Sequence, residues 1–291
     1  MSGSHLSKDF FELVKSIGES KSKQEEDRII LEEISALKKK LHDPSLSKKK
    51  SKEFVVRMLY VEMLGHDASF GYIKAIELCA STSLIPKKCG YLVSALCLSP
   101  EHEFRFMLVN QMQRDMGSAN HLEVCAGLSG VARLVTADMI PAVLNDVRKA
   151  LTHEHEAVRK KAVMALHRFR QLDPDALAHL GDAIRRTLCD RDPAVMGAAL
   201  CLFHDLVRAR PADYKDLVAS FVSILKQVVE HRLPRDYDYH RMPAPWIQMR
   251  LLRVLALLGA IEGADSALAA ELAADEGEGG GGGGSRAAAG A

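Results

Sequence analysis

Two stretches of the 291-residue chain can be laid over one another: residues 151–169, LTHEHEAVRKKAVMALHRF, and residues 188–206, LCDRDPAVMGAALCLFHDL. Ala162 then coincides with Ala199 at a spacing of 37 residues, and both stretches carry the pair Ala-Val at the same position. Because apolar residues in both recur at three- and four-residue steps, each stretch predicts an amphipathic helix. The pair indicates an internal repeat.

The small residue of this repeat can be followed towards the N-terminus. Ala126, in NHLEVCAGLSGVARL, precedes Ala162 by 36 residues, and Gly90, in PKKCGYLVSAL, precedes Ala126 by a further 36. A small residue at a fixed position lets each helix approach its neighbour closely. A period of this length holds two helices, as in HEAT and armadillo repeats. The sequence therefore predicts an all-α fold, a right-handed α-solenoid of HEAT/armadillo-like helical repeats.

Helical periodicity continues outside the repeat, and we find no convincing strand. Helices are expected at residues 9–17, 23–41 and 54–64. The second has one narrow apolar stripe, which suits packing against a single partner surface. Further along, Asp192 is expected to cap a helix whose first turn contains Pro193, since proline has no N–H to leave unpaired there.

A last helix is expected after the two prolines of RMPAPWIQMRLLRVLALLG. Its apolar face is expected to include Trp246, Met249 and Leu252. Trp246 is the only tryptophan of the chain. We interpret it as a core anchor of the last repeat, because a large aromatic side chain contributes much buried area.

Composition limits the possible partners and compartments. Lys and Arg total 39 against 38 Asp and Glu, so a net charge of +1 provides no chain-wide attraction for nucleic acid, and no nucleic-acid partner is expected. No apolar run is long enough to span a membrane, and the N-terminus does not resemble a signal peptide. We therefore expect a cytosolic protein. The six cysteines form no CxxC pair and are interpreted as reduced core residues.

The chain is expected to contain one folded region. Residues 1–8 are interpreted as a flexible N-terminus, residues 9–259 as the solenoid trunk, and residues 260–291 as a disordered Gly/Ala-rich tail. Such a tail cannot contribute to a packed core, because it has few apolar side chains to bury.

The stretch MLGHDASFGY at residues 63–72 places His66, Asp67 and Ser69 close together. A nucleophile needs a converging base and carboxylate in a pocket, and nothing nearby supplies one. The favoured interpretation is that Gly65 ends one helix and Asp67 caps the next. The chain also has no phosphate-binding loop and no HExxH or EF-hand pattern. We expect no enzymatic activity, no cofactor and no metal site.

Three blocks together carry a family resemblance: MLGHDASFGYIKAIEL (63–78), KKCGYLVSALCLSPEHE (87–103) and MPAPWIQMRLLRVLALLG (242–259). The chain resembles the N-terminal trunk of the large subunits of heterotetrameric adaptor protein complexes, the adaptins, over roughly residues 10–259. The nearest likeness is to the fourth of these complexes.

The resemblance implies a scaffold in vesicle-mediated intracellular protein transport. In this family the trunk curves around a small and a medium subunit, opposite a second large subunit. An Arf-family GTPase recruits the assembly to a membrane, where it sorts transmembrane cargo without performing chemistry. The fourth complex works at the trans-Golgi network, which implies a peripheral membrane coat. The narrow stripes of the first two helices are expected to pack on the small subunit.

The most conspicuous charged feature is LKKKLHDPSLSKKKSKEF. Residues 38–52 contain seven lysines and one aspartate. The resemblance implies that basic residues in this loop and at the start of the following helix bind an anionic phosphoinositide membrane surface. The candidates are Lys48, Lys49, Lys50 and Lys52, supported by Lys38, Lys39 and Lys40. The alternative is a solvated charge run at a helix end, where it is favourable to the helix dipole.

The resemblance also implies a GTPase contact at Ile73, Ile76 and Met107. The alternative is that these apolar residues belong to the core. Acidic substitutions separate the two, because a core site would unfold whereas a contact site would only lose recruitment.

A different class of function also fits a solenoid. A free-standing HEAT/armadillo scaffold, of the transport-receptor or phosphatase-regulatory type, would grip peptides on its own surface. An obligate adaptor subunit would instead depend on co-expression with a small subunit.

Overall fold

The computed structural model describes residues 7–259, which form two compact units. The first unit ends at Val195 and the second begins at Met196. The α-helices of the first unit are α1 (Lys8–Gly18), α2 (Lys23–Leu41), α3 (Lys48–Met63), α4 (Tyr72–Cys79), α5 (Leu84–Cys97), α6 (Phe104–Met116), α7 (His121–Leu134), α8 (Ile140–Ala150), α9 (Glu156–Leu172) and α10 (Gly181–Thr187). Short 3-10 turns precede three of them: η1 (Ser69–Gly71), η2 (Ala137–Met139) and η3 (Ala178–Leu180). The predicted all-α class is confirmed.

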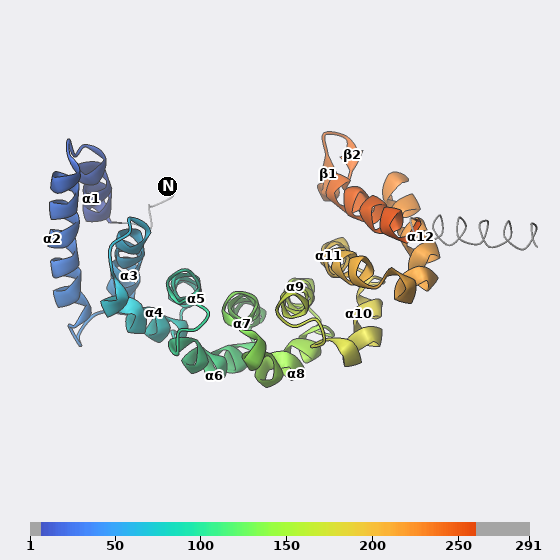
Figure 1. Cartoon of the computed structure of the whole chain (residues 1–291), viewed down its shortest axis with the longest axis horizontal. Coiled ribbons are helices and arrows are strands. Elements are labelled where there is room, and N and C mark those ends of the chain that lie inside the picture. Colours follow the sequence, from blue (N-terminus) through green and yellow to red (C-terminus); the bar gives the residue numbers. More distant parts are fainter. Residues whose placement is uncertain (1–6, 260–291) are drawn as a thin grey trace, which may run out of the picture. The chain divides into compact units, whose positions relative to one another are not determined.

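Successive helices of the first unit form antiparallel pairs that stack in two layers (Figure 1). α4 packs on α5, α6 on α7 and α8 on α9. Within one layer α3 lies beside α5, α5 beside α7 and α7 beside α9, while α4, α6 and α8 form the other layer. This is the arrangement of a helical-repeat solenoid, in which each pair covers the apolar face of the next.

The predicted small-residue register is also confirmed. Gly90, Ala162 and Ala199 are the seventh residues of α5, α9 and α11 (Pro193–Ala209), and Ala126 is the sixth residue of α7. All four are buried. The reason is clearest at Gly90, where an added Cβ would meet backbone atoms of α4.

In α7 a neighbouring glycine has the same function. A Cβ on Gly127 would lie 3.2 Å from the Met112 carbonyl oxygen of α6 and 3.0 Å from the Asp115 Cβ. The close approach of α6 and α7 therefore involves Gly127 beside Ala126. The 36-residue spacing alone does not identify it, because a buried pair of small residues offers two equivalent candidates.

Helix ends follow the local sequence. The side chains of Ser7, Ser22 and Ser47 each accept a hydrogen bond from a backbone N–H in the first turn of α1, α2 and α3. Gly65 ends α3 with a positive φ of 88°, a conformation that costs glycine little. The Asp192 carboxylate accepts from two backbone N–H groups at the start of α11, as expected for its cap.

Buried polar pairs join neighbouring helices of the first unit. Arg57 of α3 donates to both carboxylate oxygens of Glu33 on α2, at 2.7 and 2.6 Å. Asp115 of α6 accepts from the Lys87 ammonium and the Tyr91 hydroxyl of α5. Such groups are retained in an apolar interior only when their hydrogen bonds are satisfied, so these pairs set the relative position of their helices.

Two arginines tie helix ends together. Arg105 of α6 donates to the carbonyl oxygens of Leu98, which follows α5, and Leu134, the last residue of α7. Burial lowers the pKa of this guanidinium. Arg159 of α9 donates to both oxygens of Asp190, at 2.7 and 2.9 Å. The bonds of Arg105 satisfy carbonyl groups that helix ends leave unpaired, whereas those of Arg159 form an ion pair with a carboxylate.

The second unit contains most of α11, the turn η4 (Pro211–Leu217), α12 (Val218–Val229), η5 (Arg235–Tyr237) and helical residues 245–259. It also contains a β-hairpin of two strands with two residues each, β1 (Asp238–Tyr239) and β2 (Met242–Pro243), in which Asp238 lies opposite Pro243. The expectation of no strand is therefore wrong at this point. The hairpin is too short to leave a periodic pattern, and its turn residues have positive φ.

The last helix buries a face other than the predicted one. Trp246, Met249 and Leu252 are 49%, 54% and 55% exposed. The buried residues are instead Ile247, Leu251, Val254 and Leu258. The core-anchor interpretation of Trp246 is therefore wrong. Both faces are apolar, so periodicity alone could not choose between them.

Other expectations have mixed outcomes. The cysteines form no disulfide within the described residues, but only Cys79 is buried and Cys189 is exposed. None of the helices that the structure describes is both long enough and apolar enough to traverse a bilayer. Of the expected flexible ends, residues 1–6 and 260–291 lie outside the described residues, whereas Ser7 caps α1.

Candidate functional site

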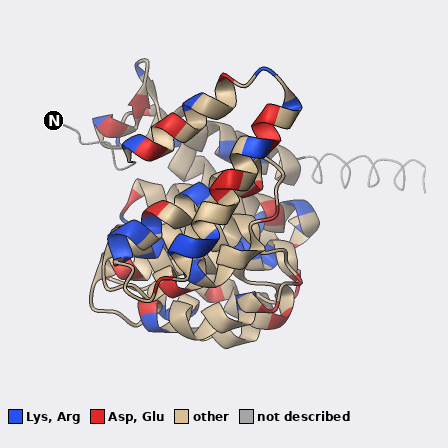
Figure 2. Cartoon of the chain, turned by 90° about the vertical axis from the view of Figure 1, so that its left-hand side faces the viewer, with Lys and Arg blue, Asp and Glu red and all other residues tan. Residues whose placement is uncertain are grey.

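The structure brings the seven candidate lysines together where α2 ends and α3 begins. Lys38, Lys39 and Lys40 lie in the last turn of α2. The other four, Lys48, Lys49, Lys50 and Lys52, lie at the start of α3, which begins six residues earlier than the predicted residue 54. We call the seven residues the lysine cluster. In Figure 2 basic segments of ribbon gather where α2 ends and α3 begins.

A short ordered turn holds the two parts of the lysine cluster close to each other. The Asp43 carboxylate accepts hydrogen bonds from the backbone N–H and the hydroxyl of Ser45, at 2.8 and 2.7 Å. These bonds lower the pKa of Asp43, and the charge of Lys50 lowers it further. The Ser47 hydroxyl then accepts from the Lys50 backbone N–H and starts α3.

Most lysine side chains of the cluster are available to a ligand. Six are exposed and Lys52 is partly buried, and among the described residues none of the seven has an ion-pair partner. Lys38 and Lys40 lie over the aromatic rings of Phe70 and Phe54, with 5.2 and 5.3 Å between nitrogen and ring centroid. These cation–π contacts place two ammonium groups without neutralising them.

Helix electrostatics separate the two halves of the lysine cluster. Lys38, Lys39 and Lys40 lie at the C-terminus of α2, where positive charge is favourable. The lysines at the start of α3 lie at a helix N-terminus with no acidic residue in its first turn, where positive charge is unfavourable. Favourable interaction with a helix dipole therefore explains the first group but not the second.

The GTPase-contact candidates lie on two adjacent helices of one layer. Ile73 and Ile76 are on α4, and Met107 is on α6, which packs beside it. Ile73 is 38% exposed and Met107 54% exposed, so neither is a core residue, whereas Ile76 is half-buried. Phe106, adjacent to Met107, is 55% exposed. The sequence pattern does not identify Phe106 as a contact candidate, because two consecutive apolar residues give no periodic signal.

The first two helices carry sparse apolar faces, as predicted. α1 buries only Phe10 and Ile17, while Phe11 is 52% exposed. On α2 the predicted stripe packs within the chain itself, because Ile30, Leu37 and Leu41 are buried. The stripe is therefore not available to a small subunit, contrary to expectation, whereas Leu31, which lies outside it, is 59% exposed. α1 and α2 therefore present apolar side chains that no described part of the chain covers.

The stretch MLGHDASFGY is a connection between helices, as predicted. Gly65 follows the end of α3, as predicted. The predicted helix cap at Asp67 is wrong: its carboxylate accepts from the Ser69 backbone N–H, and neither η1 nor α4 has a side-chain cap. His66 faces Asp27, with 3.5 Å between its ring nitrogen and the carboxylate. The hydrogen bond to Ser69 lowers the pKa of Asp67. These contacts pair His66 and Asp67 with different partners and do not align them as a catalytic relay.

Comparisons with known proteins agree with this architecture. The family described as "Adaptin N terminal region" matches residues 26–274. The AP-4 complex subunit epsilon of Arabidopsis thaliana is 53% identical over 87% of this chain and 27% of its own length. The human AP-4 complex subunit epsilon-1 is 45% identical over 85% of this chain and 22% of its own. The chain thus spans about a quarter of the length of these curated relatives.

Structural comparisons show the same type of fold. A chain of a homology model of the full-length AP-3 complex matches with a TM-score of 0.60 and 22% identity, over 74% of this chain and 35% of that one. The crystal structure of Kap121p matches with a TM-score of 0.54 and 12% identity, over 86% and 26%. At these identities the likeness concerns the fold alone.

Proposed function

The chain belongs to the adaptin family, and we propose that it is the trunk of an adaptor-complex large subunit of the epsilon type. In this role it is a scaffold for vesicle-mediated protein transport rather than an enzyme. Support comes from the match to residues 26–274 and from the identity to AP-4 epsilon subunits. The free-standing peptide-binding scaffold is less favoured, because its support is limited to fold likeness at low identity.

The proposed partners follow from this role. The stacked helices would hold one small, one medium and one other large adaptor subunit, and the assembly would sort transmembrane cargo at the trans-Golgi network. The exposed apolar residues of α1 and α2, such as Phe11 and Leu31, are proposed to pack on the small subunit. Ile73, Ile76 and Met107 are proposed to contact an Arf-family GTPase, because exposed apolar side chains suit its switch regions.

Membrane attachment is proposed to use the lysine cluster. One observation carries this proposal: lysines without an ion-pair partner in residues 7–259 lie at the unfavourable N-terminus of α3, next to three more at the end of α2. A phosphoinositide surface would supply the missing counter-charge. Each lysine near an anionic leaflet contributes about 1 kcal/mol, so several together hold a protein at a membrane.

Charge reversal tests the membrane proposal. In Lys48→Glu/Lys49→Glu/Lys50→Glu, three contributions of about 1 kcal/mol disappear, which corresponds to roughly a hundredfold weaker partitioning. The assay is co-sedimentation of the full chain with phosphatidylcholine vesicles containing a phosphoinositide. A matched variant reverses Lys15 and Lys226, which already form ion pairs on other helices.

The expected outcome is loss of sedimentation in the cluster variant and retention in the matched variant. Equal sedimentation of the cluster variant and the original chain would refute the membrane proposal. Affinity purification of the tagged chain tests the scaffold role separately. It should recover one small, one medium and one other large subunit, and recovery of none of these would contradict the adaptor assignment.

A further inference from the structure

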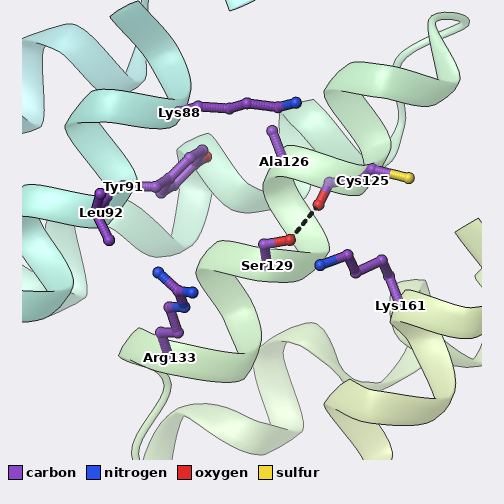
Figure 3. A pocket seen from close by; sticks show the side chains of 8 residues that line it. All are labelled: Lys88, Tyr91, Leu92, Cys125, Ala126, Ser129, Arg133 and Lys161. Atoms are coloured by element: carbon purple, nitrogen blue, oxygen red, sulfur yellow. Dashed lines mark hydrogen bonds between the residues drawn. The ribbon is translucent and has the colours of Figure 1, made fainter. Parts of the chain in front are cut away.

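A cavity of about 350 Å³ opens on the layer formed by α5, α7 and α9, and no residue of the lysine cluster lines it. Its walls include Tyr91 and Leu92 of α5 and Ser129 of α7 (Figure 3). Tyr91 is buried, with its hydroxyl directed to Asp115, so it forms a fixed wall. The Ser129 hydroxyl donates to the Cys125 carbonyl of its own helix and is not free to donate to a ligand.

Three cations from three different helices surround this cavity. Lys88 comes from α5, Arg133 from α7 and Lys161 from α9. Figure 3 shows Lys161 directed towards Ser129, the Arg133 guanidinium on the other side of Ser129, and Lys88 above both. All three are exposed, no acidic residue lines the cavity, and among the described residues none of the three has an ion-pair partner.

The charges of two of these cations act on the same thiol, that of Cys125. Burial raises the pKa of the Cys125 thiol at the cavity wall, the charges of Lys161 and Lys88 act to lower it, and the charge of Glu156 acts to raise it. A thiolate is stabilised by nearby positive charge. Because three cations and no acidic residue line the cavity, it favours anionic groups.

The surface around the cavity is also apolar. Leu92 and Leu96 on α5 are 43% and 60% exposed, Leu122 on α7 is 43% exposed and Met164 on α9 is 36% exposed. Helical spacing places Leu96, Leu122 and Met164 on the same faces as the residues that line the cavity. A lipid headgroup or a free phosphate would engage the cations and leave these side chains uncovered. A peptide with both acidic and apolar residues would engage both.

We propose that the face of α5, α7 and α9 binds an extended acidic–apolar peptide segment of a partner protein. Its acidic side chains would contact Lys88, Arg133 and Lys161, and its apolar side chains would cover Leu92 and Met164. Packed helices lie 8–10 Å apart, so the face is roughly 20 Å wide. About six or seven extended residues cross that distance. This proposal does not depend on the adaptor assignment or on the lysine cluster.

The test uses the full chain and a labelled peptide in which glutamate and leucine alternate, followed by fluorescence anisotropy. The peptide should bind, and affinity should fall with added salt. Charge reversal in Lys88→Glu/Arg133→Glu/Lys161→Glu would remove three exposed contacts with the acidic side chains of the peptide and should weaken binding roughly tenfold or more. The lysine-cluster variant described above is the matched control and should bind the peptide normally.

A second measurement follows the cavity wall. Bound peptide should slow alkylation of Cys125, read by mass spectrometry, without slowing that of the exposed Cys189. Circular dichroism confirms the fold of each variant, and neutral Lys88→Gln/Arg133→Gln/Lys161→Gln should give an intermediate loss.

Three outcomes would overturn the proposal. The first is equal binding of a peptide with glutamine in place of glutamate, and the second is unchanged binding by the charge-reversed variant. The third is binding of soluble inositol trisphosphate, with no binding of the peptide, which would assign the cavity to a headgroup.

Discussion

Substitution of Gly90 by alanine tests the repeat packing most directly. Gly90 lies in the middle of α5, where alanine normally favours a helix by about 1 kcal/mol. Its added Cβ, however, would lie 2.6 Å from the Cys79 backbone nitrogen and 2.7 Å from the Ala75 carbonyl oxygen. Both atoms belong to α4, so no side-chain rotation can relieve the contact.

The two effects have opposite signs, and their sizes decide the outcome. Ordinary contact begins near 3.4 Å, so α4 and α5 must separate by roughly 0.7 Å. Such overpacking of a core costs about 1–3 kcal/mol. This cost equals or exceeds the helix-propensity gain of about 1 kcal/mol, so we expect Gly90→Ala to destabilise the chain by up to about 2 kcal/mol. Gly197 of α11 is the matched control, because its Cβ would meet the Ile247 side chain at 3.7 Å.

Urea unfolding followed by far-UV circular dichroism measures both variants. The midpoint should fall for Gly90→Ala and rise slightly for Gly197→Ala, in line with about 0.5–1 kcal/mol of helix propensity. Hydrogen exchange should show lost protection in α4 and α5. If Gly90→Ala stabilised the chain as much as Gly197→Ala does, close approach at the small-residue register would be refuted.

Three further predictions concern other contacts. Glu33→Gln should cost about 3–5 kcal/mol in urea unfolding because it leaves the buried Arg57 uncompensated, whereas the double substitution of both by methionine should recover most of the loss. Burial pushes the pKa of Asp190 upwards, but hydrogen bonds from Arg159 and a backbone N–H outweigh it and lower that pKa. Its stabilisation is therefore complete above the ordinary carboxyl pKa of about 3.9 and is lost as pH falls through the folded-state pKa, so the urea midpoints of the original chain and Asp190→Asn should differ at neutral pH and converge on acidification. Met107→Asp, at an exposed site, should change the free energy of unfolding by no more than about 0.5 kcal/mol yet abolish pull-down by a GTP-loaded Arf-family GTPase, and unchanged pull-down would exclude this contact.

The lysine-rich stretch shows where sequence interpretation failed locally. The sequence predicts a helix only from residue 54, yet residues 48–53 form the first turns of α3. Lysine is a good helix former, and Ser47 supplies the cap. Lys48, Lys49, Lys50 and Lys52 therefore lie at a helix N-terminus, where the helix dipole disfavours positive charge, and not at a helix C-terminus, where it would favour positive charge.

The sequence by itself determined the helical class, the repeat period and many helix ends, because these depend on residues close together in the chain. Serine and aspartate caps, Gly65 and the register of Gly90, Ala162 and Ala199 all act locally or once per repeat. The membership of the adaptin family was also recognisable from short blocks of sequence.

Only the tertiary structure decided which of two apolar faces is covered and which distant charges meet. Trp246 lies outside the core because the opposite face of its helix is buried. Lys88, Arg133 and Lys161 do not follow the repeat spacing, yet three stacked helices place them around one cavity. Side-chain burial and convergence depend on the packing of whole helices, which a linear pattern of residues does not contain.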